Sequence, residues 1–208
     1  SIHCKNYSIH INDWIAFKQL YKQISPSTTF ILVDENTEKY CLPHLVENID
    51  ETVQIIRIPS GEQNKNLNTC QVVWSKLLQN GADRHSLIIN LGGGVIGDLG
   101  GFCAATYMRG IKFIQMPTTL LSQVDASVGG KLGVDLLGFK NIVGMIRDPD
   151  GVFIFTDFLT TLPSDQMRSG YAELLKHGLI ADKKIWESLS KNAGFETLDY
   201  EKLVYESV

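Results

Sequence analysis

Short apolar runs alternate with stretches of helical periodicity along most of this chain. The runs are strand-like and are followed by polar, glycine or proline residues; they cover residues 29–33, 53–58, 86–91, 112–116 and 152–155. Residues 66–79 place apolar side chains at near-helical spacing, and Gly81 is suited to cap that helix. Strands that alternate with helices pair in parallel through right-handed crossovers, so the pattern predicts an α/β fold with a mostly parallel, Rossmann-like sheet and flanking helices.

The pattern changes after Pro163. Helical periodicity covers residues 164–180 and 200–208, and Asp182 is placed to cap another helix that ends near residue 191. The apolar faces of such helices need a partner to cover them. We therefore predict an α/β domain over residues 1–163 and the beginning of an incomplete, all-helical domain over residues 164–208.

Polar or glycine-rich segments follow several of the strands. Parallel sheets bind ligands beyond the carboxyl ends of their strands, and Asp34, residues 60–62 and residues 117–119 occupy such positions. The glycines of residues 92–97 fit G-x-G-x-x-G, which lets backbone approach a diphosphate at a helix N-terminus. A tight strand–helix turn would need the same glycines, and no acidic residue follows at the usual spacing of about 20 to hold a ribose. Taken together, these loops favour a nucleotide-type cofactor and hence an enzyme.

Cations stand beside glycines and small residues in the second half of the chain, at Arg109, Lys131, Lys140 and Lys176. Together they suit a small, multiply anionic substrate, because Lys supplies point charges and Arg a planar fork for phosphate or carboxylate. Each taken singly is more typical of a solvated surface charge. Lys131 differs, since the two preceding glycines bring the backbone close and leave its ammonium projecting.

Two carboxylates and a histidine are further candidates. Asp125 lies among small and apolar residues, where it can be a helix cap, part of an ion pair or the group that holds a substrate hydroxyl. Glu173 shares a helix face with Lys176 and His177, which fits either a routine helix pair or a metal site. One Glu and one His do not complete a zinc site, and the remaining histidines show no ligand spacing.

Composition narrows the class of protein. The 208 residues carry a formal net charge of −4, with 44% hydrophobic and 20% charged residues, so no basic field favours nucleic acid or an anionic membrane. The four cysteines are widely spaced, which fits a reducing compartment. No apolar run is long enough to span a bilayer and no signal-peptide pattern is present, so we expect a cytoplasmic protein.

Several ordered motifs closely resemble those of the 3-dehydroquinate synthases, within the sugar phosphate cyclase family. They are Gly-Gly-Gly-Val-Ile-Gly-Asp at 92–98, Tyr-Met-Arg-Gly at 107–110, the block at 117–131, Lys-Asn at 140–141 and Gly-Tyr-Ala-Glu-Leu-Leu-Lys at 170–176. The resemblance implies an NAD-binding α/β domain, a helical domain and a zinc or cobalt ion in the cleft between them. The implied reaction converts 3-deoxy-D-arabino-heptulosonate 7-phosphate to 3-dehydroquinate and phosphate, with NAD reduced and reoxidised in each cycle.

The resemblance also assigns roles to residues. Asp125, Lys131, Lys140, Asn141 and Lys176 match substrate contacts, and Arg109 matches an arginine that reaches the phosphate in the neighbouring subunit's site, which implies a homodimer. Glu173 matches one metal ligand, and the remaining ligands are expected beyond residue 208. The positions that match NAD contacts are Asp34, Glu62, Lys65, Gly93, Gly94, Val95, Asp98, Thr118, Thr119 and Leu121, with Phe158, Thr161 and Leu162 as weaker matches.

Three departures from the family pattern affect local contacts. Asp135 stands where we expect asparagine, Gln166 where glutamate is common, and residues 145–148 replace an aromatic-rich segment. Three other functions remain open: a sister cyclase of the 2-deoxy-scyllo-inosose or amino-dehydroquinate synthase type, a metal-dependent polyol dehydrogenase, and a non-catalytic nucleotide-binding module. A sister cyclase would differ from the main hypothesis in its substrate, and a polyol dehydrogenase would differ in producing net NADH. We expect the 208 residues alone to be inactive.

Overall fold

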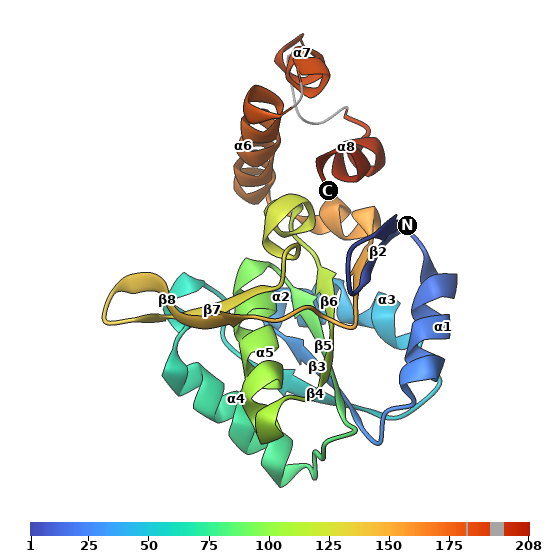
Figure 1. Cartoon of the computed structure of the whole chain (residues 1–208), viewed down its shortest axis with the longest axis vertical. Helices are drawn as coiled ribbons and strands as arrows, with labels where there is room; N and C mark the ends of the chain where they lie inside the picture. The colour runs from blue at the N-terminus through green and yellow to red at the C-terminus, as the bar shows by residue number, and fades with distance from the viewer. Residues whose placement is uncertain (182, 192–197) are drawn as a thin grey trace.

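A computed structural model describes residues 1–181, 183–191 and 198–208, and Figure 1 shows the arrangement of the chain. The predicted cap at Asp182 lies outside the described residues. Among those that are described, no helix combines the length and apolar character needed to cross a bilayer.

A central sheet is built mainly from parallel strands, as the sequence predicts. Its order is β1-β2-β9-β6-β5-β3-β4, and only the β1–β2 pair is antiparallel. Every residue of β3 and of β5 is buried, which is typical of parallel strands covered on both faces. The strands are β1 (Ile2–His3), β2 (Ser8–Ile11), β3 (Thr29–Val33), β4 (Val53–Arg57), β5 (Leu87–Gly92), β6 (Lys112–Pro117) and β9 (Gly151–Ile154).

Helices cover both faces of this sheet. On one face, α1 (Trp14–Ile24), α2 (Glu35–Tyr40) and α3 (Leu42–Val46) pack with one set of sheet residues; on the other face lie α4 (Leu67–Gln79) and α5 (Gly94–Thr106). The alternation along β3 explains the division, because Phe30 and Leu32 join the α4–α5 core while Ile31 and Val33 join the opposite core. The helix predicted over residues 66–79 is confirmed as α4.

The carboxyl-terminal part is helical in the residues described. It contains α6 (Ser164–Ile180), α7 (Lys183–Lys191) and α8 (Tyr200–Ser207), which lie above the carboxyl edge of the sheet in Figure 1. Leu174 of α6 and Leu203 and Val204 of α8 share a core with Leu120, in the segment after β6. The helices predicted over residues 164–180 and 200–208 are therefore confirmed, whereas the boundary between two domains stays a prediction.

Two regions to which the sequence pattern assigned no element are ordered. Residues 1–28 form β1, β2 and α1, and β2 adds a parallel strand beside β9. Strands β7 (Lys131–Leu136) and β8 (Phe139–Ile146) form a separate two-stranded hairpin, which projects sideways across α5 in Figure 1. Leu132 anchors the hairpin: it packs so closely over Gly101 of α5 that a Cβ at Gly101 would overlap its side chain.

Candidate active site at the carboxyl edge of the sheet

The glycine turn and the loop after β6 lie against each other at one edge of the sheet. Gly92 ends β5 in register with Pro117 at the end of β6. A Cβ built at Gly94 would lie 3.5 Å from the Cβ of Ala126, and one at Gly93 would lie 3.0 Å from Cγ2 of Thr119. Glycine at these positions therefore permits the close approach of two loops that follow neighbouring strands.

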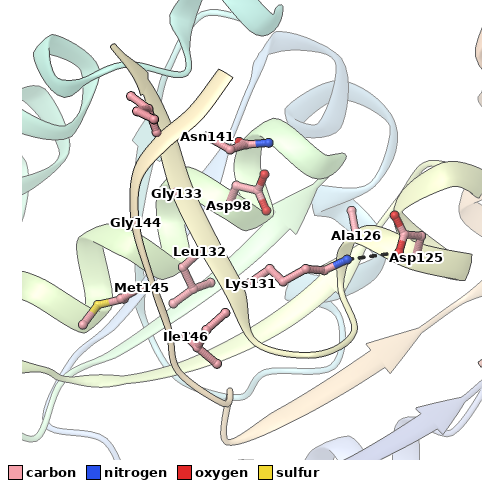
Figure 2. A pocket seen from close by; sticks show the side chains of 11 residues that line it. Asp98, Asp125, Ala126, Lys131, Leu132, Gly133, Asn141, Gly144, Met145 and Ile146 are labelled. Atoms are coloured by element: carbon pink, nitrogen blue, oxygen red, sulfur yellow. Dashed lines mark hydrogen bonds and ion pairs between the residues drawn. The ribbon is translucent and has the colours of Figure 1, made fainter. Parts of the chain in front are cut away.

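A cavity of about 550 Å³ opens beside this junction (Figure 2). It brings together Asp98 of α5, Asp125 from the π-helix η3 (Ser122–Ala126), and Lys131 and Asn141 from the hairpin. These residues come from both predicted sets, since Asp98 matches a cofactor contact and the other three match substrate contacts. The remaining lining residues are Ala126, Leu132, Gly133, Ile142, Gly144, Met145 and Ile146.

Lys131 and Asp125 face each other in the cavity. The Lys131 Nζ lies 3.1 Å from Asp125 Oδ1, as the dashed line in Figure 2 shows. Their side chains are 56% and 42% exposed, so solvent screens the pair and its contribution to stability is small. An ammonium held this loosely can exchange its carboxylate partner for a phosphate or another anion.

A second cation, Lys65, is buried beside the same cavity. Its side chain is 5% exposed, and its Nζ lies 3.1 Å from Glu62, 3.4 Å from Asp98 and 3.9 Å from Asp135. Burial tends to lower the pKa of Lys65, but the three surrounding carboxylates outweigh it, and the net direction is upward. Burial raises the pKa of Asp98 to about 6 and outweighs the Lys65 ammonium, which acts in the opposite direction. We name Glu62, Lys65, Asp98 and Asp135 the Lys65 cluster.

Lys140 extends the Lys65 cluster to the surface. Its Nζ lies 3.2 Å from Glu62 Oε1, and its side chain is 70% exposed. The structure thus places Lys140 beside a predicted cofactor contact and outside the set of residues that line the cavity. Its predicted role toward the substrate stays a prediction.

The other predicted cofactor contacts lie on several different elements near the same edge of the sheet. Asp34 caps α2, and its Oδ1 accepts the N–H groups of Asn36 and Thr37. Phe158 is buried in the sheet core, on the 3-10 helix η4 (Thr156–Thr161) that precedes Leu162. The rest of this set lies in the loop after β6 and on the first turn of α5: Thr118, Thr119, Leu121 and Val95.

Arg109 lies apart from the cavity. It is exposed at the end of η2 (Tyr107–Arg109) and forms no salt bridge within the described parts of the chain. Met108 and Arg109 have φ angles of 49° and 69°, two consecutive left-handed residues that an L side chain adopts at a cost. The structure does not bring Arg109 to the cavity of its own chain.

Glu173, Lys176 and His177 meet on one face of α6. Glu173, whose side chain is 14% exposed, contacts the Lys176 ammonium and lies 3.2 Å from His177 Nε2. The Glu173 carboxylate raises the pKa of Lys176, and His177 Nδ1 contacts the hydroxyl of Ser207 in α8. A buried carboxylate beside an imidazole fits part of a metal site. No group of three or more potential ligands occurs in residues 1–181, 183–191 and 198–208.

The sequence reasoning missed two features of the site. The hairpin contributes most of the cavity wall, and residues 139–146 lack the regular apolar alternation that would have revealed β8. Asp135, noted only as a departure from the family pattern, belongs to the Lys65 cluster.

The fold and this edge of the sheet define a Rossmann-like α/β protein with a dinucleotide-type glycine turn and an adjoining polar cavity. Sequence comparison identifies the family: the profile of the 3-dehydroquinate synthase N-terminal family matches residues 55–169. The chain belongs to this family.

Curated relatives support this family assignment. The chain is 43% identical over 188 residues to a 3-dehydroquinate synthase of Parabacteroides distasonis, covering 89% of this chain and 51% of that one. It is 49% identical over 150 residues to the enzyme of Pelobacter propionicus, covering 72% and 42%. The chain thus spans about half the length of the curated relatives it matches.

Solved structures share the fold. A 2-deoxy-scyllo-inosose synthase complexed with carbaglucose-6-phosphate, NAD+ and Co2+ superposes with a TM-score of 0.77 at 28% identity, covering 86% of this chain and 49% of that one. A 2-epi-5-epi-valiolone synthase of Streptomyces hygroscopicus subsp. jinggangensis, with NAD+ and Zn2+ bound, superposes with a TM-score of 0.88 at 24% identity, covering 100% and 61%. The second likeness shows the fold alone.

Proposed function

We propose that this chain supplies the NAD-binding part and much of the substrate pocket of a 3-dehydroquinate synthase. The enzyme would convert 3-deoxy-D-arabino-heptulosonate 7-phosphate to 3-dehydroquinate and phosphate. The observation that supports this most is the shared cavity, in which Asp98 of the cofactor side meets Asp125 and Lys131 of the substrate side. Family membership and identities of 43% and 49% to 3-dehydroquinate synthases point the same way.

NAD fits the edge of the sheet described above. The first turn of α5 begins at Gly93 and Gly94, which suits a diphosphate at a helix N-terminus. The Lys65 cluster adds polar groups beside it. When bound, NAD supplies a hydride acceptor that is restored within the cycle.

The chain's own side chains would bind and orient the sugar phosphate. The Lys131 ammonium is suited to neutralise a phosphate oxygen or the negative charge that develops as the C–O bond to phosphate breaks. Asp125 would then accept a hydrogen bond from a substrate hydroxyl instead of pairing with Lys131. Asn141 offers a neutral amide to a further hydroxyl.

A divalent metal belongs to the proposal, with Glu173 as one ligand. A bound metal would supply Lewis acidity toward the hydroxyl that is oxidised. The Oε1 atom of Glu173 is buried and lies between Lys176 and His177, so a cation is already favoured at this position. Replacing Glu173 with Gln should lower the metal content of the full protein, as measured by elemental analysis.

We also propose that the active protein is a homodimer in which Arg109 serves the neighbouring site. Arg109 is exposed and away from its own cavity. The hairpin exposes a set of apolar side chains unusual for free surface: Leu137 at 89%, Phe139 at 69%, Ile142 at 62% and Ile146 at 75% exposure. A cytoplasmic location remains a prediction.

Phosphate release by the full-length protein tests the function. We expect phosphate from heptulosonate phosphate without net NADH accumulation, and little release from glucose 6-phosphate, the sugar counterpart of the carbaglucose-6-phosphate bound by the related synthase. Release from glucose 6-phosphate alone would favour a sister cyclase. Net NADH production would favour a polyol dehydrogenase, and NAD binding without either reaction would favour a binding module.

Mixing two inactive variants tests the shared site. Arg109→Ala and Lys131→Ala should each be nearly inactive as pure proteins. Mixed dimers contain one site with both residues intact, so reassociation in equal amounts should restore about a quarter of the wild-type activity. If activity is not restored although mixed dimers form, Arg109 does not act across the interface.

A further inference from the structure

The hairpin contains an irregularity at the residues predicted to bind the substrate. Val134 pairs with Val143 and Leu136 pairs with Phe139, so the single residue Asp135 on β7 faces residues 140–142 on β8. Extra residues on one strand bend it and change the direction of its side chains. The bulge thus carries both Lys140 and Asn141 out of the regular ladder.

Asp135 stabilises this bulge through its carboxylate. Its Oδ1 accepts the backbone N–H of Asn141 at 2.8 Å. Asn141 has a φ angle of 54°, a left-handed conformation that asparagine tolerates better than most residues but that still needs local support. Without Asp135, this N–H would lose its side-chain acceptor and the bulge would lose this internal hydrogen bond.

Asp135 also joins the hairpin to the cofactor side of the cavity. Its backbone N–H donates to the carbonyl of Lys65 at 2.8 Å, and its Oδ1 lies 3.9 Å from the Lys65 Nζ. On the other side of the bulge, Lys140 pairs with Glu62. One residue therefore contacts both the buried cation of the Lys65 cluster and the strand that carries Asn141 into the cavity.

We propose that Asp135 is a positioning residue that sets Asn141 and Lys140 relative to the bound cofactor, through the acceptor oxygen it offers to the Asn141 N–H. This role rests on the proposed function, because it concerns the placement of substrate contacts. The property of Asp135 that this role requires is the oxygen that accepts the Asn141 N–H. Asparagine at this position keeps the acceptor and removes the charge, whereas alanine removes both.

The matched pair Asp135→Asn and Asp135→Ala tests the proposal in the full protein. For Asp135→Ala we expect about a tenfold rise in KM for heptulosonate phosphate, the size of one lost hydrogen bond, while the Kd for NAD stays within about threefold. Asp135→Asn should restore KM to within about twofold of wild type. Circular dichroism and thermal unfolding confirm that both variants are folded.

Amide hydrogen exchange gives a second readout that does not depend on activity. The Asn141 N–H should exchange about tenfold faster in Asp135→Ala and at the wild-type rate in Asp135→Asn. Unchanged exchange and KM in Asp135→Ala would overturn the proposal. Equal impairment of both variants would overturn it too, because the charge toward Lys65 and not the acceptor would then matter. If the wild-type protein releases no phosphate, the proposed function fails, while amide exchange still decides the role of Asp135.

Discussion

Two lysines beside one cavity are held in opposite ways. Lys65 is 5% exposed and has carboxylates of three residues within 4 Å, whereas Lys131 is 56% exposed and, among the residues described, pairs with Asp125 alone. A buried cation must keep its partners, because separating it from them leaves uncompensated charge at low dielectric. An exposed cation loses little when its partner is exchanged.

The difference distinguishes a charge that stabilises the fold, at Lys65, from a charge that we propose binds a ligand, at Lys131. The Lys65 cluster joins residues from the segment after β4, from α5 and from the hairpin, so it fixes the side of the cavity that we propose for the cofactor before any ligand arrives. Lys131 keeps its ammonium in solvent beside the opening, where an anionic substrate can reach it. The cavity thus combines a prearranged side and an adaptable side.

Removing the buried charge should have the largest effect. Lys65→Met leaves Glu62, Asp98 and Asp135 without their shared cation, and we expect a loss of about 3–5 kcal/mol in the free energy of unfolding, measured by urea denaturation. Lys131→Met is the matched control and should change that free energy by less than about 1 kcal/mol. Equal losses in the two variants would remove the distinction between the two lysines.

Unlike the free energy of unfolding, the catalytic activity should depend strongly on Lys131. Lys131→Met should lower kcat/KM for heptulosonate phosphate about 100-fold, because a desolvated contact to a developing anion is lost in a stably folded protein. The Kd for NAD, measured by calorimetry, should stay close to the wild-type value. A kcat/KM within threefold of wild type, roughly the experimental scatter, would place Lys131 outside the substrate site.

The buried carboxyl of the Lys65 cluster predicts a dependence on pH. Burial raises the pKa of Asp98 to about 6, above its value in the unfolded chain, so the folded state holds a proton that the unfolded state releases. The stabilisation this provides is fully present below about pH 4 and is lost as pH rises through 6, by about 3 kcal/mol.

The variant Asp98→Asn isolates this effect from other titrating groups. The difference in unfolding free energy between wild type and Asp98→Asn should fall between pH 4 and pH 7 and then level off, because the asparagine does not titrate. A difference that is constant over this interval would mean that the Asp98 carboxyl is ionised throughout. Urea denaturation at several pH values measures it.

The sequence was sufficient for strands β3, β4, β5, β6 and β9 of the parallel sheet and for the ends of β3 and β5. Strand β5 is a run of apolar residues that stops at glycine, and β3 stops at an acidic cap, so composition marks both ends locally. Helix α6 matches its predicted bounds, because Pro163 and the helical spacing after it depend only on neighbouring residues. Local rules suffice where the determinants are local.

The Lys65 cluster and the hairpin could not be derived in the same way. The cluster depends on four residues spread from Glu62 to Asp135, which only the folded chain brings within about 4 Å. Strand β8 exposes nearly all of its residues, so it lacks the buried alternation that signals a strand. The role of Asp135 could not be predicted from the sequence either, because its partner on β8 is a backbone N–H, which is not specific to any residue type.

Salt should produce the smallest effect and should act on one side of the cavity only. Counterions screen exposed charges such as Lys131, so raising ionic strength from about 0.05 M to about 0.5 M should increase KM for heptulosonate phosphate three- to tenfold. The Lys65 cluster is shielded by burial, and the difference in unfolding free energy between wild type and Lys65→Met should stay nearly constant over the same range. Steady-state kinetics and urea denaturation in matched buffers measure the two quantities. Equal salt sensitivity of both would show that Lys65 is accessible to solvent ions, because only an accessible charge is screened.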